Sequence, residues 1–93
     1  MTYEAEIGEL REEINRLNVE IVERLAQRVE VAQKIGDVKR RHGKPVVDRS
    51  REAMVYEQIR DLATRFNIDP AGVERVFREV IRLCTEAQLE EGR

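Results

Sequence analysis

Two cationic residues, Arg28 and Lys39, lie on the apolar face of the first long periodic segment of the sequence. At about 100° per residue on a helix, both fall within roughly 20° of the centre of the apolar stripe. Nearly three whole turns separate them, or roughly 16 Å along the same face. Two long side chains that lean towards each other could hold one small anion between them. The alternative is that each packs its stem on the stripe and extends its charge into water.

A third cation, Arg11, lies at the border of the same stripe. Its distance from Arg28 along a helix axis is about 25 Å, so it cannot reach the same ligand from the same chain. It could reach that ligand from the antiparallel helix of a second copy. The pattern therefore favours an anion site that two chains share.

Polar residues also occupy core-facing positions in two later segments. Asp48 and Glu52 lie on the backward extension of an apolar row, and Arg51 flanks them. Gln88 borders the apolar face of the last segment, one turn after Cys84. Structural alternatives exist: Asp48 suits a helix N-cap, and Glu52 in a first turn offsets the helix dipole. Cys84 suits a small core residue, and Gln88 suits the surface of a frayed helix end.

These positions supply cations, a carboxylate and an amide, which is a set suited to a polyanion that carries hydroxyl groups. The sequence has no phosphate-binding glycine loop, no Cys/His metal cluster and no hydroxyl or thiol nucleophile beside a base. Its only histidine, His42, is expected in a solvated loop with Gly43 and Pro45. We therefore expect neither a metal nor a cofactor.

The elements that must position these residues are three helices. In the first, apolar residues recur at steps of three and four without an interrupting Pro. Asp48 is a candidate N-cap for the second, and Asp69 followed by Pro70 marks the start of the third. The sequence therefore predicts an all-α fold. Its expected helices span about 5–41, 49–66 and 70–90, in a single domain over 1–93.

The first helix is too long for a compact single chain. It should extend over roughly 54 Å, whereas a compact monomer of this length should be roughly 30 Å across. Its free end would expose Ile and Leu side chains to water. We therefore expect a two-fold homodimer with interlocked long helices, and an extended coiled coil is the structural alternative.

Composition limits the class of protein. The 93 residues include 17 Lys and Arg and 19 Asp and Glu, for a net charge of −2. This balance gives no basic excess for nucleic acid or for an anionic membrane. One cysteine cannot form an internal disulfide, and no apolar run has transmembrane length. We expect a cytoplasmic protein.

Five stretches of the sequence form a larger pattern. They are L-R-x-x-I-x-x-L-N at 10–18, L-A-Q-R at 25–28, V-A-Q-K-I-G-D-V-K at 31–39, P-V-x-D-x-x-R-E at 45–52 and C-x-x-x-Q at 84–88. Together they resemble a known family, the small all-helical chorismate mutases, and follow the order and spacing of that family over nearly the whole chain. The resemblance implies an intertwined homodimer of three-helix protomers, in which each of two equivalent sites borrows one arginine from the other subunit.

The resemblance also implies roles for individual residues. Arg28, together with Arg11 from the other chain, corresponds to the pair that holds the two carboxylates of chorismate. Lys39 and Gln88 correspond to the pair that faces the ether oxygen.

The remaining correspondences lie around the substrate hydroxyl and the carboxylates. Glu52 and Asp48, the latter through its side chain or backbone, correspond to groups near the hydroxyl, and Arg51 to an arginine that lines the site. Cys84 departs from the family, since many relatives carry Ser there in contact with a carboxylate. A thiol is a weaker donor than a hydroxyl, so this contact is expected to weaken.

The implied reaction is the pericyclic Claisen rearrangement of chorismate to prephenate, in phenylalanine and tyrosine biosynthesis. It requires orientation of the substrate and donors aimed at the ether oxygen, which agrees with the absence of nucleophile and metal motifs. One alternative is an isochorismate pyruvate lyase, which shares the fold, although the stretch 44–48 and its flanking Arg51 and Glu52 favour the mutase. Another is a non-catalytic helical interaction or regulatory module. Binding to a second shikimate-pathway enzyme is left open.

Overall fold

The computed structural model describes residues 2–91, and within that range it contains three helices and no strand. The predicted all-α fold is therefore confirmed. The helices are α1 (Tyr3–Arg41), α2 (Arg49–Arg65) and α3 (Pro70–Glu91). Their ends are close to the expected ones: α1 starts at Tyr3 rather than near residue 5, and α2 ends at Arg65 rather than near residue 66.

Local signals explain where α1 begins and ends. Thr2 is the N-cap, and its hydroxyl accepts a hydrogen bond of 3.1 Å from the backbone N–H of Ala5. At the other end Gly43 takes φ +64°, a left-handed conformation that glycine adopts without strain. The backbone N–H of Lys44 then donates to the carbonyl of Lys39 at 2.8 Å. This pairing is the Schellman arrangement, which satisfies carbonyls at a helix end.

The turn between α2 and α3 follows the same rules. Asn67 takes φ 59°, and the N–H of Ile68 donates to the carbonyl of Ala63 at 2.9 Å. Asp69 then caps α3, because its Oδ2 accepts a 3.1 Å hydrogen bond from the N–H of Gly72. Pro70 occupies the first helical position, as the sequence predicts.

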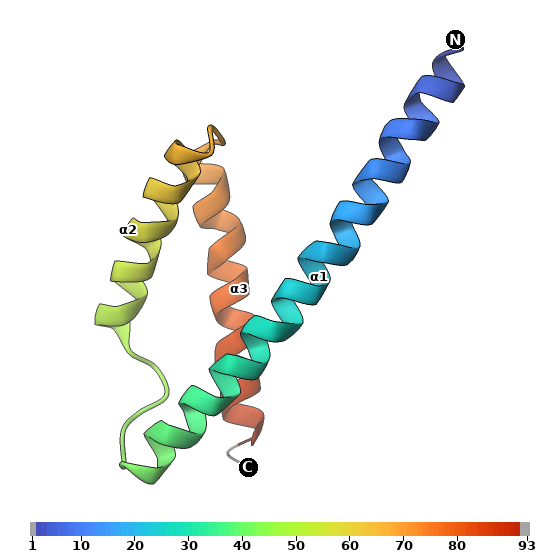
Figure 1. Ribbon diagram of the computed structural model, residues 1–93. Coiled ribbons are helices and arrows are strands. Elements are labelled where there is room, and N and C mark those ends of the chain that lie inside the picture. Colours follow the sequence, from blue (N-terminus) through green and yellow to red (C-terminus); the bar gives the residue numbers. More distant parts are fainter. Residues whose placement is uncertain (1, 92–93) are drawn as a thin grey trace.

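The third helix holds the fold together. α3 packs against α1 and against α2, which lie on either side of it (Figure 1). Small side chains allow the helices to approach closely, and few large side chains are deeply buried. The buried apolar residues are Ala32 of α1, Ile59 and Ala63 of α2, and Val80 and Cys84 of α3.

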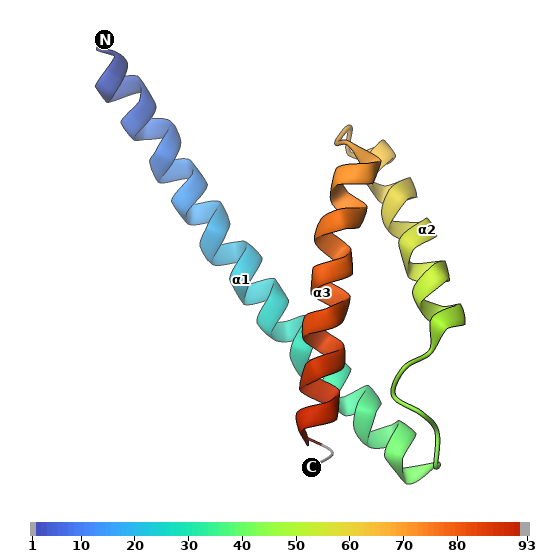
Figure 2. The same cartoon turned by 180° about the vertical axis from the view of Figure 1, so that it is seen from behind.

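The N-terminal half of α1 extends away from the other two helices (Figures 1 and 2). The molecule measures 62 × 27 × 15 Å and has a radius of gyration of 17.3 Å. A compact chain of this length would have a radius of gyration of about 12 Å. The overhang leaves large apolar side chains exposed, including Leu10 (56%), Ile14 (55%) and Ile21 (57%). In residues 2–91, none of the helices has the length and apolar character needed to cross a membrane.

A polar cluster joins α2 to α3 on the outer surface. Glu74 of α3 accepts hydrogen bonds from Arg60 of α2 and, at 2.8 Å, from Arg78 of its own helix. The guanidinium of Arg78 also lies 4.4 Å from the ring centroid of Tyr56. The hydrogen bonds from Arg78 and then Arg60 lower the pKa of Glu74.

Candidate active site

Most of the candidate residues meet in one cavity. The cavity has a volume of about 370 Å³ and lies between the C-terminal half of α1, the loop after it, the start of α2 and the last turns of α3. Seven of the eight residues singled out from the sequence line it, and only Arg11 does not. The seven are Arg28, Lys39, Asp48, Arg51, Glu52, Cys84 and Gln88.

Arg28 faces inward rather than extending into water. Its Nη1 donates to the sulfur of Cys84 at 3.0 Å, and this contact joins α1 to α3. The Cys84 side chain is 4% exposed, so it is a core residue and also part of the cavity wall. The guanidinium is therefore already aimed at the cavity before any ligand binds.

Lys39 is tied to the loop that follows α1. Its ammonium group donates a 2.7 Å hydrogen bond to the backbone carbonyl of Val46. Val46 is half-buried and lines the cavity, whereas Val47 is 38% exposed. Only the first of these two valines returns to the interior. The loop thus fixes the position of the Lys39 ammonium group, one of the two cations on the apolar stripe of α1.

Gln88 is buried, with 8% of its surface exposed, so the frayed-end interpretation is wrong. Its Nε2 donates to the carbonyl of Cys84 at 3.3 Å. Its Oε1 is buried without a hydrogen-bond partner. A buried polar atom without a partner costs free energy, which a ligand that completes the hydrogen bonding would recover. The amide of Gln88 thus places a buried group with unused hydrogen-bonding capacity in the cavity wall.

The two carboxylates of the cavity already have partners. Asp48 caps α2, as the sequence predicts, because its Oδ1 accepts a 3.0 Å hydrogen bond from the N–H of Arg51. Glu52 Oε2 lies 3.0 Å from Nη1 of Arg49. With three cations and two carboxylates in its wall, the cavity carries a formal excess of one positive charge. Within residues 2–91, no cluster of three or more His, Cys, Asp or Glu side chains is arranged to bind a metal ion.

Arg11 lies on the exposed overhang of α1, far from this cavity. Along the helix it is about 25 Å from Arg28, so one chain cannot bring the two together. The structure thus separates Arg11 from the other seven candidates.

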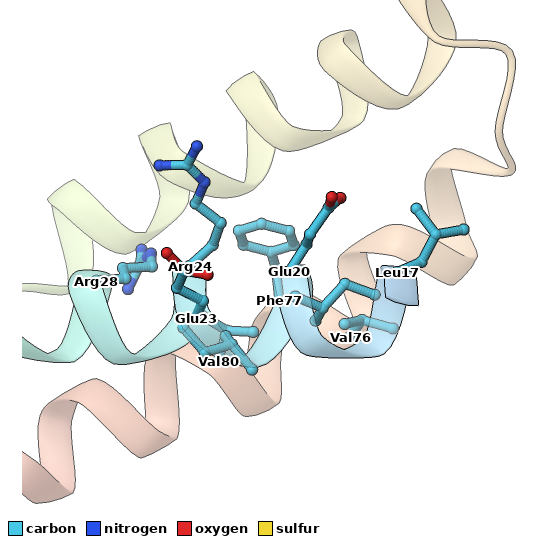
Figure 3. Close-up of a pocket in the computed structure, with 10 residues that line it drawn as sticks. Leu17, Glu20, Glu23, Arg24, Arg28, Val76, Phe77 and Val80 are labelled. Atoms are coloured by element: carbon cyan, nitrogen blue, oxygen red, sulfur yellow. The ribbon is translucent and has the colours of Figure 1, made fainter. Parts of the chain in front are cut away.

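A second hollow, of about 750 Å³, lies where the overhang of α1 leaves α3 (Figure 3). Leu17 and Glu20 of α1 and Val76 and Phe77 of α3 are among the side chains that line it, and Arg28 lines both hollows. Apolar groups make up most of its wall.

Several residues near the cavity were missed from the sequence. Val46 acts through its backbone carbonyl, for which a side-chain pattern gives no signal. Thr85 lines the cavity beside Cys84 and could have been noticed as its neighbour. Gly36 and Arg40 contact Gln88 from α1. The sequence signal for Gly36 and its neighbour Arg40 was a glycine inside a strongly periodic helix, where a glycine usually has a packing or functional reason.

A model of the family described as "Chorismate mutase type II" matches residues 10–89, which include every candidate residue of the site. The chain belongs to the type II chorismate mutase family. The resemblance inferred from the five sequence stretches is thereby confirmed, and the three-helix, all-α architecture agrees with it.

Individual relatives support the same family. The chain is 28% identical over 75 residues to the chorismate mutase of Methanocaldococcus jannaschii, covering 81% of this chain and 76% of that one. It is 31% identical over 88 residues to the T-protein of Enterobacter agglomerans, covering 95% of this chain and 24% of that protein. It is also 31% identical over 86 residues to the bifunctional chorismate mutase/prephenate dehydratase of Aquifex aeolicus, covering 85% of this chain. The chain spans about a quarter of the length of the last two relatives, at 24% and 23%.

Proposed function

We propose that this chain is a chorismate mutase that catalyses the rearrangement of chorismate to prephenate. The observation that supports this most strongly is that Arg28, Lys39 and Gln88 line one cavity in a member of the type II chorismate mutase family. Chorismate carries two carboxylates, an ether oxygen and a hydroxyl group. The cavity wall offers cations, a buried amide and two carboxylates, which match these groups in kind.

Substrate orientation is the first part of the proposed mechanism. Arg28 binds one carboxylate through its guanidinium, and Arg11 of the partner subunit binds the other. Holding both carboxylates fixes the compact, chair-like geometry in which the new carbon–carbon bond forms. Such orientation can lower a barrier by about 7–11 kcal/mol in favourable cases.

Charge stabilisation is the second part. Negative charge grows on the ether oxygen as its carbon–oxygen bond breaks. The ammonium group of Lys39 and the amide N–H of Gln88 donate to this oxygen, with most effect in the transition state. These interactions are strong because the cavity is half-enclosed and water is displaced by the substrate. Glu52 and Asp48 bind the hydroxyl group, and Arg51 lines the site near them.

A two-fold homodimer completes the site in this proposal. The exposed apolar face of the overhang and the 750 Å³ hollow beside it would be covered by the long helix of a second copy. The same antiparallel pairing brings the partner's Arg11 to the cavity. With that residue the formal excess in the wall becomes about two positive charges, which matches a dicarboxylate.

The proposed setting is the cytoplasm, in the synthesis of phenylalanine and tyrosine through prephenate. The lone thiol of Cys84 is free, which agrees with a reducing compartment. Two of the relatives are much longer than this chain, and one is named for both a chorismate mutase and a prephenate dehydratase. Association with another enzyme of the shikimate pathway is therefore part of the proposal.

One assay tests the central proposal. Purified chain is incubated with chorismate, and loss of chorismate and gain of prephenate are followed by chromatography against a protein-free control. Conversion well above the spontaneous rate is expected. A parallel incubation with isochorismate tests the lyase alternative. Release of pyruvate from isochorismate, with no prephenate formed from chorismate, would replace the proposed mutase function with that of a lyase. No conversion of either substrate, and no rise in Tm with chorismate, would leave a non-catalytic helical module.

A further inference from the structure

Gly36 marks the closest approach of α1 to the catalytic end of α3. It is buried, and a Cβ atom placed on it would lie 3.0 Å from Cγ and 3.2 Å from Cβ of Gln88. Distances this short require the glutamine stem to move by a few tenths of an ångström. Glycine is also a poorer helix former than alanine, so local helix stability does not explain its presence here. The missing side chain is therefore explained by the position of Gln88.

Arg40 holds the same glutamine from its backbone. Its Nη1 donates a 3.0 Å hydrogen bond to the carbonyl of Gln88, and its guanidinium also bonds to the carboxylate of Asp37. Gln88 lies in the last turn of α3, where carbonyls have no partner within the helix. Arg40 is half-buried and supplies that partner from α1. Two neighbouring residues of α1 thus constrain both the stem and the main chain of Gln88.

We propose that Gly36 and Arg40 are positioning residues, which set the amide of Gln88 at the depth in the cavity where it meets the substrate. This inference rests on the proposed mutase function, in which the amide of Gln88 donates a hydrogen bond to the ether oxygen of the substrate. The amide has a buried, unpartnered Oε1 and a single hydrogen bond of its own, at 3.3 Å. Its side chain is therefore weakly held by its own bonds, and its place depends on the helix packed against it. Displacement of a donor by about 1 Å can lower a rate by about 10²-fold.

Gly36→Ala tests the stem contact, and Gly8→Ala is its matched control. Gly8 lies in the same helix, roughly 120° from the centre of the apolar stripe. A Cβ on Gly8 meets nothing within 4 Å. Both variants should gain helix propensity, so Gly8→Ala should not lower Tm, whereas in Gly36→Ala this gain is offset by the close contact with Gln88. We expect Gly36→Ala to lower kcat by several-fold, up to about 10-fold, with little change in KM, and Gly8→Ala to leave kcat unchanged.

Arg40→Met tests the backbone contact with a variant that keeps the length of the stem. Its control is Arg41→Met, since Arg41 is an exposed cation in the same turn. We expect Arg40→Met to lower kcat by about 10-fold. Arg40→Lys should recover most of that loss, because Lys can still donate a hydrogen bond to the carbonyl. Arg41→Met should have the kcat of the parent chain. If Gly36→Ala fails to fold, this second pair decides the inference.

Nuclear magnetic resonance gives a readout that does not depend on turnover. The side-chain NH₂ signals of Gln88 are assigned from their loss in Gln88→Glu. They should shift in Gly36→Ala and in Arg40→Met and stay in place in the two controls. A parent chain that converts chorismate, with Gly36→Ala and Arg40→Met at full kcat, would overturn the positioning role and leave the proposed function standing. A parent chain without conversion would overturn the proposed function, and the positioning role with it.

Discussion

Nη1 of Arg28 on α1 donates to the sulfur of Cys84 on α3 across 3.0 Å. The contact holds a guanidinium at the cavity wall before a ligand arrives. A thiol is a weak acceptor, whereas a carboxylate accepts a charge-assisted hydrogen bond that is roughly twice as strong as a neutral one. In the proposed site, the sulfur would orient Arg28 and would yield readily to a carboxylate of the substrate.

The first prediction concerns this thiol. Cys84→Ser should fold, keep the contact to Arg28 and bind substrate more tightly, because a hydroxyl donates a stronger hydrogen bond to a carboxylate than a thiol does. KM for chorismate should fall by about 2-fold to 5-fold, which corresponds to about 0.5–1 kcal/mol of added hydrogen bonding. Tm should fall by less than about 5 °C, because Ser is close to Cys in size. The measurements are steady-state kinetics and thermal melting.

Cys84→Ala is the control for this substitution, since it removes the polar atom and nearly keeps the volume. It should raise KM and leave Tm close to that of the parent chain. If Cys84→Ser instead unfolds the protein while Cys84→Ala does not, the thiol acts only as an apolar core residue.

The second prediction concerns Lys39, whose ammonium group is held by the carbonyl of Val46. Lys39→Ala should lower kcat by about 10²–10³-fold, as expected for loss of a donor that acts in the transition state. Lys34→Ala is the control, because Lys34 is an exposed cation of the same helix. Kinetics on both variants at saturating chorismate give the comparison. A Lys39→Ala enzyme with unchanged kcat would remove this residue from the mechanism.

Much of the fold and most of the polar residues of the cavity wall could be predicted because their signals are local. Apolar periodicity fixed the three helices, and Asp48 and Asp69 could be read as caps from their own short segments. Arg28 and Lys39 stood out because cations on an apolar stripe need a polar environment. Each of these inferences depends on residues within a few turns of one another, so no knowledge of the tertiary packing was required.

The features that could not be predicted depend on pairs of residues far apart in the sequence or on backbone atoms. Gly36 and Arg40 matter only because α3 places Gln88 against them, and the bond from Lys39 to Val46 uses a backbone atom. The burial of Gln88 likewise follows from this packing and not from its place near a chain end. No pattern within one helix records such contacts.

The third prediction concerns stability and pH. Hydrogen bonds from Arg78 and Arg60 lower the pKa of Glu74 in the folded chain. The unfolded pKa of Glu is about 4.3, so the stabilisation is fully present above that pH and is lost as the pH falls through the lower, folded pKa. Glu74→Gln should therefore lower Tm at pH 7 by a few degrees at most, since the cluster is exposed to solvent. The gap between the two melting curves should narrow as the pH falls below about 4.3.

Thermal melting of both proteins from neutral to acid pH measures this gap. Glu57→Gln is the control, since Glu57 is an exposed carboxylate of the neighbouring helix. Its melting temperature should follow that of the parent chain across the range. A gap between parent and Glu74→Gln that stays constant down to the lowest pH would contradict the role given to the ionised carboxylate.

The fourth prediction concerns the shared site. Arg11→Ala and Arg28→Ala should each be inactive as pure dimers, since every site then lacks one of its two arginines. After subunit exchange in an equal mixture, half of the dimers are mixed, and each mixed dimer has one site with both arginines. The mixture should therefore recover about a quarter of the parent activity. Labelled subunits and native mass spectrometry confirm that exchange has occurred.

A double variant that carries both Arg11→Ala and Arg28→Ala gives a matched control, in which mixing should lower the activity instead of restoring it. Mixed with an equal amount of parent chain, it forms dimers in which neither site has both arginines. If sites are shared, activity per parent chain falls to about half, because only half of the parent chains remain paired with each other. If each chain carries a complete site, activity per parent chain does not change. Recovery in the first mixture together with loss in the second is a pattern that a self-contained protomer cannot produce.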